Sequence, residues 1–82
     1  MMDEDFLTPG ELGHIIAMNV RMRRKMRRLS LKRLSEMSGV SYGSMKRFEY
    51  SGEIALISLL KIAIALDCAD AFMQLFKNAK LY

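Results

Sequence analysis

Residues Leu29–Gly52, LSLKRLSEMSGVSYGSMKRFEYSG, predict two short helices joined by a tight turn centred on Gly39. Each helix is expected to begin at a serine, Ser30 or Ser41, because a hydroxyl accepts hydrogen bonds from the free backbone N–H groups of a first turn. Apolar residues recur every three to four positions, so each helix has one stripe to bury. These residues are Leu31, Leu34 and Met37 in the first helix and Met45 and Phe48 in the second.

The second helix leaves a polar and basic face exposed if this stripe is buried. That face consists of Tyr42, Gly43, Ser44, Lys46 and Arg47. Val40, between the helices, is expected to fill the angle that they form. A short, capped, basic helix held out by an apolar elbow is what a DNA-reading helix-turn-helix requires. The alternative interpretation is a solvated helix surface.

Length and composition predict one small all-α domain. Eighty-two residues, half of them apolar, suit a compact fold and argue against disorder. No segment alternates apolar and polar residues with the period of a strand, so we expect a compact bundle of about four to six helices. The longest apolar run, Ile62–Leu66, is too short to span a bilayer. The single cysteine, Cys68, and the acidic start of the chain favour a reducing, cytoplasmic location without membrane contact.

Positive charge is concentrated in one part of the sequence. The net charge is +4, and eight of the thirteen basic residues lie between Arg21 and Arg33. No acidic residue occurs between Glu11 and Glu36. A solvated helix face usually mixes signs, whereas a cluster of one sign attracts a polyanion.

The first helix is expected to begin at Thr8-Pro9-Gly10-Glu11, which combines a capping box with a helix-starting proline. It should end near Arg27, with a kink or break allowed around residues 17–19. Its expected core stripe is Leu12, Ile15, Ile16, Val20 and Met26. We divide the chain into residues 1–18, an N-terminal extension with the start of this helix, and residues 19–82, the helix-turn-helix domain with a C-terminal helix.

The remaining chain predicts a loop and two more helices. The loop covers Glu49–Ala55, and the next helix covers Leu56–Leu66 with apolar residues on more than one face, so it should be buried on most sides. Asp67 or Asp70 is expected to cap a last helix that reaches Phe76. The apolar C-terminal segment either packs on the core or forms a dimer contact. It contains Phe72, Met73, Leu75, Phe76, Leu81 and Tyr82.

Catalytic and metal-binding patterns are missing from the sequence. The glycines lack the spacing of a phosphate-binding loop, and no Ser–His–acid arrangement is evident. His14 has no ligating residues near it in the sequence, so we expect neither a metal site nor a cofactor. Asp67 and Asp70 suit helix capping better than acid–base catalysis.

The chain resembles the lambda-repressor/Cro-like helix-turn-helix family, also called the XRE family, over Val20–Phe76. The matching residues are Leu29-Ser30, Leu34, Gly39-Val40-Ser41, Met45, Phe48-Glu49, Gly52, Ser58-Leu59-Leu60-Lys61-Ile62-Ala63 and Ala65-Leu66. The resemblance implies a bundle of about five helices that binds operator DNA, usually as a dimer, with the third helix in the major groove.

The resemblance also implies roles for single residues. Positions facing bases or phosphates are Tyr42, Gly43, Ser44, Lys46 and Arg47, with the Arg47 fork suited to guanine. Arg24 and Glu49 match a pair that joins the first and third helices and orients the arginine near a phosphate. The family often has glutamine where this chain has Leu31, so that backbone contact is not carried over. The loop after Glu49 is one residue longer than in short phage repressors.

Our main hypothesis is a sequence-specific transcriptional regulator, with repression as its expected action. Helix 41–49 would read bases, and two copies, joined through the C-terminal apolar segment, would bind half-sites about one helical turn apart. Phosphate contacts are assigned to Arg24, Arg28, Ser30, Lys32 and Ser41. One alternative is an antitoxin that binds a toxin and represses its own operon. Another is non-specific DNA or RNA binding by the basic run alone.

Overall fold

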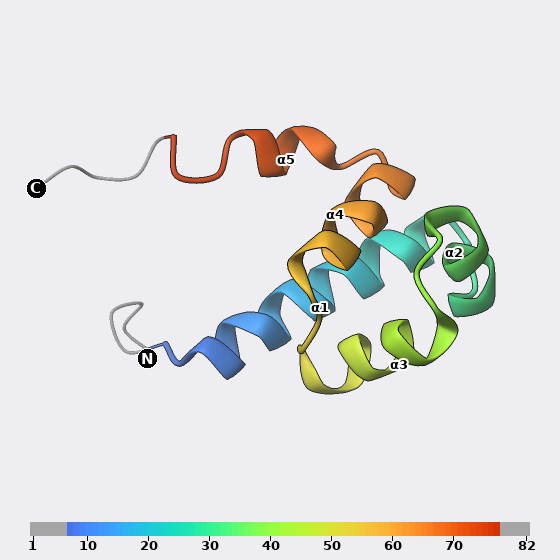
Figure 1. Ribbon diagram of the computed structural model, residues 1–82, viewed down its shortest axis with the longest axis horizontal. Helices are drawn as coiled ribbons and strands as arrows, with labels where there is room; N and C mark the ends of the chain where they lie inside the picture. The colour runs from blue at the N-terminus through green and yellow to red at the C-terminus, as the bar shows by residue number, and fades with distance from the viewer. Residues whose placement is uncertain (1–6, 78–82) are drawn as a thin grey trace, which may run out of the picture.

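The architecture is entirely helical across residues 7–77, the part of the chain that the computed structural model describes (Figure 1). Its five helices are α1 (Pro9–Met26), α2 (Leu31–Ser38), α3 (Tyr42–Ser51), α4 (Leu56–Ala65) and α5 (Ala69–Met73). Helix α3 packs on α1 and α2, α4 packs on α2, and α5 packs on α4. The predicted small all-α bundle is therefore confirmed.

Helix α1 begins with the predicted capping box. The Glu11 backbone N–H donates to the Thr8 hydroxyl at 3.1 Å, and the Thr8 N–H donates to the Glu11 carboxylate at 2.9 Å. The helix continues unbroken for 18 residues, so the kink considered around residues 17–19 is absent. Ala17 is buried within this stretch, and its small side chain lets α1 pass close to the core. The division after residue 18 falls inside this one helix.

The elbow, formed by α2, α3 and the turn between them, is present as the sequence predicts. Ser30 Oγ accepts from the Arg33 N–H at 3.0 Å, and Ser41 Oγ accepts from the Ser44 N–H at 3.1 Å. Gly39 ends α2 with φ of 77°, a conformation that glycine adopts without steric cost. Val40 is buried in the angle between the helices. The elbow is thus fixed by caps at its start and an apolar plug at its centre.

The core unites residues from α1 to α4, and the predicted α2 stripe is only partly confirmed, because Leu34 is buried and Leu31 partly buried while Met37 is exposed. Its buried apolar residues are Ala17, Leu34, Val40, Met45, Phe48, Leu59, Ile62, Ala63 and Leu66. Much of the predicted α1 stripe was wrong, because Leu12, Ile15 and Met26 are exposed. Only Ile16 and Val20 of that stripe pack against the core. Helix α1 instead buries Ala17 and Arg24, whose side chains lie on the face toward α3.

Two predicted helix ends need correction. Helix α3 continues to Ser51, whose hydroxyl donates to the Arg47 carbonyl at 2.7 Å, and it ends at Gly52 with φ of 79°. The connecting loop is therefore shorter than predicted. Helix α5 ends at Met73 rather than Phe76, and neither aspartate caps it. Asp67 instead takes a left-handed conformation and lies 3.4 Å from Arg27.

Helix α4 is less buried than its composition predicts. Leu56, Ile57 and Ile64 are each more than 60% exposed, so the expectation of burial on most sides was wrong. The bundle covers only the face that carries Leu59, Ile62 and Leu66. In a domain this small, too few elements are present to cover a helix on all sides.

Some expectations concern residues outside the described part. They are the contributions of Leu81 and Tyr82 to a C-terminal contact. Between residues 7 and 77, no helix has the length and apolarity needed to cross a membrane.

Candidate nucleic-acid interface

Helix α3 buries one face and exposes a polar one, as its sequence predicts. Met45 and Phe48 are almost inaccessible. The five residues assigned to base contact are all exposed and come from a single helix: Tyr42, Gly43, Ser44, Lys46 and Arg47. We call this surface, together with Tyr50, the α3 face.

Tyr50 belongs to the α3 face although the sequence analysis missed it. Its side chain is 85% exposed, more than that of Tyr42. It follows Lys46 by four residues and Arg47 by three, so it lies on the same side of the helix. This spacing could have identified Tyr50, but the helix predicted from the sequence ends at residue 49 and excludes it.

Arg47 has an acidic neighbour in Glu53, which follows the end of α3. Its guanidinium donates to the Glu53 carboxylate at 2.8 Å, and both side chains are about 70% exposed. The backbone N–H of Glu53 donates to the Ser51 hydroxyl, which fixes the turn that carries Glu53. An exposed pair of this kind is weak, so Arg47 retains the freedom to exchange Glu53 for another acceptor.

The rest of the α3 face is organised within the helix. The Lys46 ammonium lies 6.0 Å from the centre of the Tyr42 ring, within range of a cation–π contact. The Ser41 hydroxyl donates to the Ser44 hydroxyl at 2.9 Å. At Gly43, a Cβ atom would meet nothing within 4 Å, so no internal packing requires this glycine.

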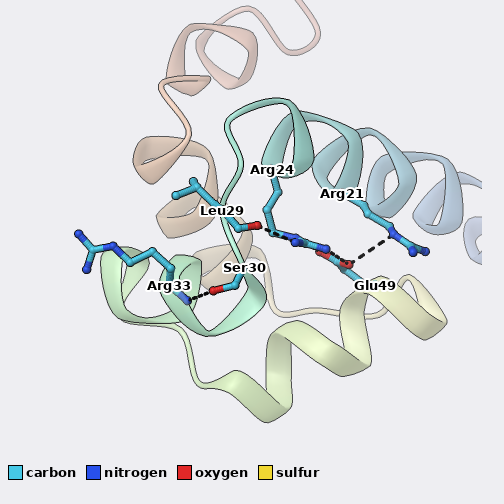
Figure 2. A network of polar contacts seen from close by, with 6 residues as sticks. All are labelled: Arg21, Arg24, Leu29, Ser30, Arg33 and Glu49. Carbon is cyan, nitrogen blue, oxygen red and sulfur yellow. Dashed lines mark hydrogen bonds and ion pairs between the residues drawn. The ribbon is translucent and has the colours of Figure 1, made fainter.

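A buried ion pair joins α3 to α1, and Figure 2 shows it from close by. The Arg24 guanidinium donates to both carboxylate oxygens of Glu49, at 2.9 and 3.1 Å, and to the Leu29 carbonyl at 2.7 Å. The side chains of Arg24 and Glu49 are only 9% and 11% exposed. Arg21 approaches the same carboxylate at 4.0 Å. The structure therefore contains the pair that the resemblance implies.

This geometry leaves Arg24 little surface for the phosphate contact assigned to it. Its three hydrogen bonds are all internal, and its side chain has almost no surface. The arginine is needed inside because the nearly buried Glu49 carboxylate would otherwise have only the more distant Arg21, 4.0 Å away, to balance its charge. Arg24 therefore holds α3 against α1.

Among the other basic residues of Arg21–Arg33, some form ion pairs and others have exposed side chains. Arg27 lies 3.4 Å from Asp67, and Arg33 lies 3.5 Å from Glu36. Arg28 and Lys32 are exposed on either side of the Ser30 cap. Arg28 adopts φ of 58°, and the backbone turns there between α1 and α2. Ser30 and Ser41, also assigned to phosphate contact, are exposed while they cap their helices.

Residues for metal chemistry are not gathered in the described part of the chain. No group of three or more His, Cys, Asp or Glu side chains lies close enough together between residues 7 and 77 to hold an ion. His14 is exposed on α1. No family model, curated protein or solved structure matches the chain.

Proposed function

We propose that this chain is a sequence-specific DNA-binding regulator that inserts α3 into the major groove. The observation that carries the proposal is the α3 face, a polar and basic surface on a helix that is anchored on its opposite side. Anchoring comes from Phe48 and Met45 in the core and from the Arg24–Glu49 pair. Side chains that read bases must be held in register by such a scaffold.

Arg47 is the residue with the strongest base preference in this proposal. A guanidinium can donate two parallel hydrogen bonds to the O6 and N7 atoms of guanine. The Arg47 side chain pairs with Glu53 when no DNA is bound and can exchange this weak partner for a base. Lys46 and Tyr50 lie beside it, where they contact bases or the neighbouring backbone.

Gly43 supports the proposal because a glycine lowers the stability of α3 here, and no packing contact within the described chain requires one. A glycine inside a helix destabilises it by about 1 kcal/mol relative to alanine. No neighbour within the chain needs the space above Gly43. Close approach of a DNA backbone or base edge to α3 accounts for this position.

The exposed cations beside the elbow supply affinity rather than sequence preference. Arg28 and Lys32 flank the start of α2, and phosphate contact by such side chains releases counterions from DNA. Binding should therefore weaken steeply as salt is raised. Two copies acting together would bind a symmetric operator with half-sites about one helical turn apart.

Selection from random duplex DNA with the purified chain tests the proposal. The expected result is an enriched, two-fold-symmetric sequence whose affinity falls with salt concentration. Equal affinity for enriched and random duplexes would reject sequence-specific binding and favour non-specific binding by the basic run. Affinity that is independent of salt would reject DNA binding through the cations.

An antitoxin role is the second candidate function, favoured by the exposed apolar residues of α4 and α5. Leu56, Ile57, Ile64 and Met73 are each more than 60% exposed. A surface of this kind often marks a protein interface. The test is titration of the chain with the product of the gene beside its own. Inhibition of that product, lost in Ile64→Lys, would support an antitoxin, and absence of binding would reject this partner.

A further inference from the structure

Helix α1 carries a second apolar stripe on the side away from the core. Its residues are Leu12, Ile15, Met18, Met22 and Met26, each between 42% and 78% exposed. They follow one another at spacings of three, three, four and four, so they lie along one side of the helix. We call them the α1 stripe.

The two sides of α1 are clearly separated. Ala17 and Arg24 are buried, and Ile16 and Val20 pack beside them on the core. At about 100° per residue, these positions lie roughly opposite the α1 stripe. From Leu12 to Met26 the stripe covers about 21 Å of helix. Asn19 is the polar residue that lies among the stripe residues on this side of the helix, and a row of exposed apolar residues of this length marks an interaction site more often than isolated ones do.

Charge along α1 selects the direction in which another helix could lie. Glu11 is at the N-terminal end of the helix, and Arg21, Arg23 and Lys25 are near its C-terminal end. The residues before α1 add Asp3, Glu4 and Asp5 to the acidic end of the sequence. A second α1 lying parallel would place cations against cations. An antiparallel α1 places opposite charges together and also opposes the two helix dipoles.

We propose that the α1 stripe binds the same stripe of a second copy of this chain, antiparallel and about a two-fold axis near Met18. Glu11 and Lys25 are equally distant from Met18 in the sequence, so each Glu11 lies at the level of the other copy's Lys25. Ile15 then lies near the level of Met22 in the other copy. The contact is self-complementary, as a two-fold interface must be. Flexible methionine side chains suit the fit between two identical surfaces.

The apolar surface of α4 and α5 is the alternative place for a second copy. The C-terminal apolar segment is the dimer contact expected from the sequence, and residues 78–82 of that segment lie outside the described part. The described charges of the α4 and α5 surface do not separate toward two ends, because Lys61 lies within α4 and both Asp70 and Lys77 lie in or after α5. The α1 stripe has the charge separation that this surface lacks.

Cysteine cross-linking tests the proposed arrangement in the full chain with Cys68→Ser as background. Met18→Cys should form an intermolecular disulfide on mild oxidation, because the two-fold axis brings the two copies of residue 18 together. Met26→Cys is the matched control, since an antiparallel pair separates its two copies by about 24 Å. A disulfide requires Cα atoms within about 7 Å. Cross-linking of both variants, or of neither, would overturn the proposal.

Sedimentation across a range of protein concentrations tests the same contact without oxidation. Met22→Glu should weaken dimerisation by about tenfold or more, because it places a charge inside the apolar contact. Ile64→Glu, on exposed α4, should leave the dimer unchanged, and circular dichroism checks that both variants remain helical. A chain that is monomeric throughout, or a dimer that only Ile64→Glu disrupts, would overturn the proposal. Neither assay contains DNA, so these results are independent of the proposed DNA-binding function.

Discussion

Gly13 of α1 and Gly52 at the end of α3 lie backbone against backbone. A Cβ atom on Gly13 would lie 2.6 Å from the Gly52 carbonyl oxygen, and one on Gly52 would lie 2.7 Å from the backbone of Gly13 and His14. Real Cβ atoms do not approach this closely. The two glycines therefore set the distance between α1 and α3, and with it the position of the α3 face.

Replacing Gly13 by alanine should destabilise the fold by roughly 1–3 kcal/mol, as overpacking of a tight contact does. The added Cβ would strike backbone, which cannot move aside as a flexible side chain can. Urea unfolding of Gly13→Ala measures the effect. Gly10→Ala is the control, because its Cβ would meet only the Thr8 hydroxyl at 3.9 Å, and it should leave stability unchanged or slightly raised. Equal stability of the two variants would contradict the proposed role of Gly13.

The two Arg–Glu pairs should respond very differently to the loss of their arginines. Arg24→Met leaves the buried Glu49 with only the half-exposed Arg21, 4.0 Å away, and should cost about 3 kcal/mol in the free energy of unfolding. Arg47→Met removes the exposed pair with Glu53 and should cost at most about 1 kcal/mol. Denaturant unfolding of both variants makes the comparison. If Arg24→Met is no more harmful than Arg47→Met, the ion pair does not hold α3 on α1.

The sequence predicted features that depend on residues close together in the chain. The caps at Ser30 and Ser41, the turn at Gly39 and the plug at Val40 all involve neighbours within a few positions. The exposed polar side of α3 followed from helical periodicity alone. These features come from local hydrogen bonding and from one buried stripe per helix, so local reasoning recovers them.

Features that depend on packing between distant segments were missed. The contact of Gly13 with Gly52 joins two distant parts of the chain and is not visible in the sequence. Helix α1 has apolar residues on two sides, so its pattern could not tell which side faces the core. Ala17, which is small, is almost fully buried on the true core face. The Arg24–Glu49 pair was expected only through a family resemblance, since 25 residues separate its members.

Gly43→Ala separates stability from the proposed DNA contact. The substitution should raise stability by up to about 1 kcal/mol, because alanine is the better helix former and the space above Gly43 is open. Affinity for the selected operator should fall, since the new methyl group would stand between α3 and the DNA. Thermal unfolding and operator titration of the same preparation give both quantities. A variant that gains stability and keeps full affinity would show that DNA does not approach α3 at Gly43.

Arg47→Ala and Lys32→Ala should affect DNA binding in distinguishable ways. Loss of Arg47 should cost about 1–3 kcal/mol on the selected operator and relax the preference at one base position. Loss of Lys32 should weaken binding to all sequences equally. It should also reduce the steepness of the plot of log affinity against log salt concentration by about 1. Titration of each variant with operator and with random duplex at several salt concentrations gives both patterns. The same uniform loss in both variants would support non-specific binding by the cations.

The capping box at the start of α1 should make stability depend on pH. The Thr8 backbone N–H donates to the Glu11 carboxylate, and this hydrogen bond, with a smaller contribution from the Thr8 side chain, lowers the pKa of Glu11 below its ordinary value. The charged form is thus favoured in the folded state. Its contribution is fully present above the pKa of the unfolded chain and is lost as the pH falls through the lower pKa of the folded chain. NMR titration of the Glu11 carboxyl should show the lowered pKa.

Thr8→Ala removes the side-chain part of this interaction and keeps the backbone N–H. The pKa of Glu11 should therefore move only part of the way back toward its ordinary value, because the backbone hydrogen bond is the larger cause of the shift. Glu11→Gln cannot ionise and should lose the acid-dependent part of stability that this residue provides. Glu36, which lies in α2 outside the capping box, serves as the internal reference in the same spectra. If Thr8→Ala left the pKa of Glu11 unmoved, the hydroxyl would have no part in holding the carboxylate at the start of α1.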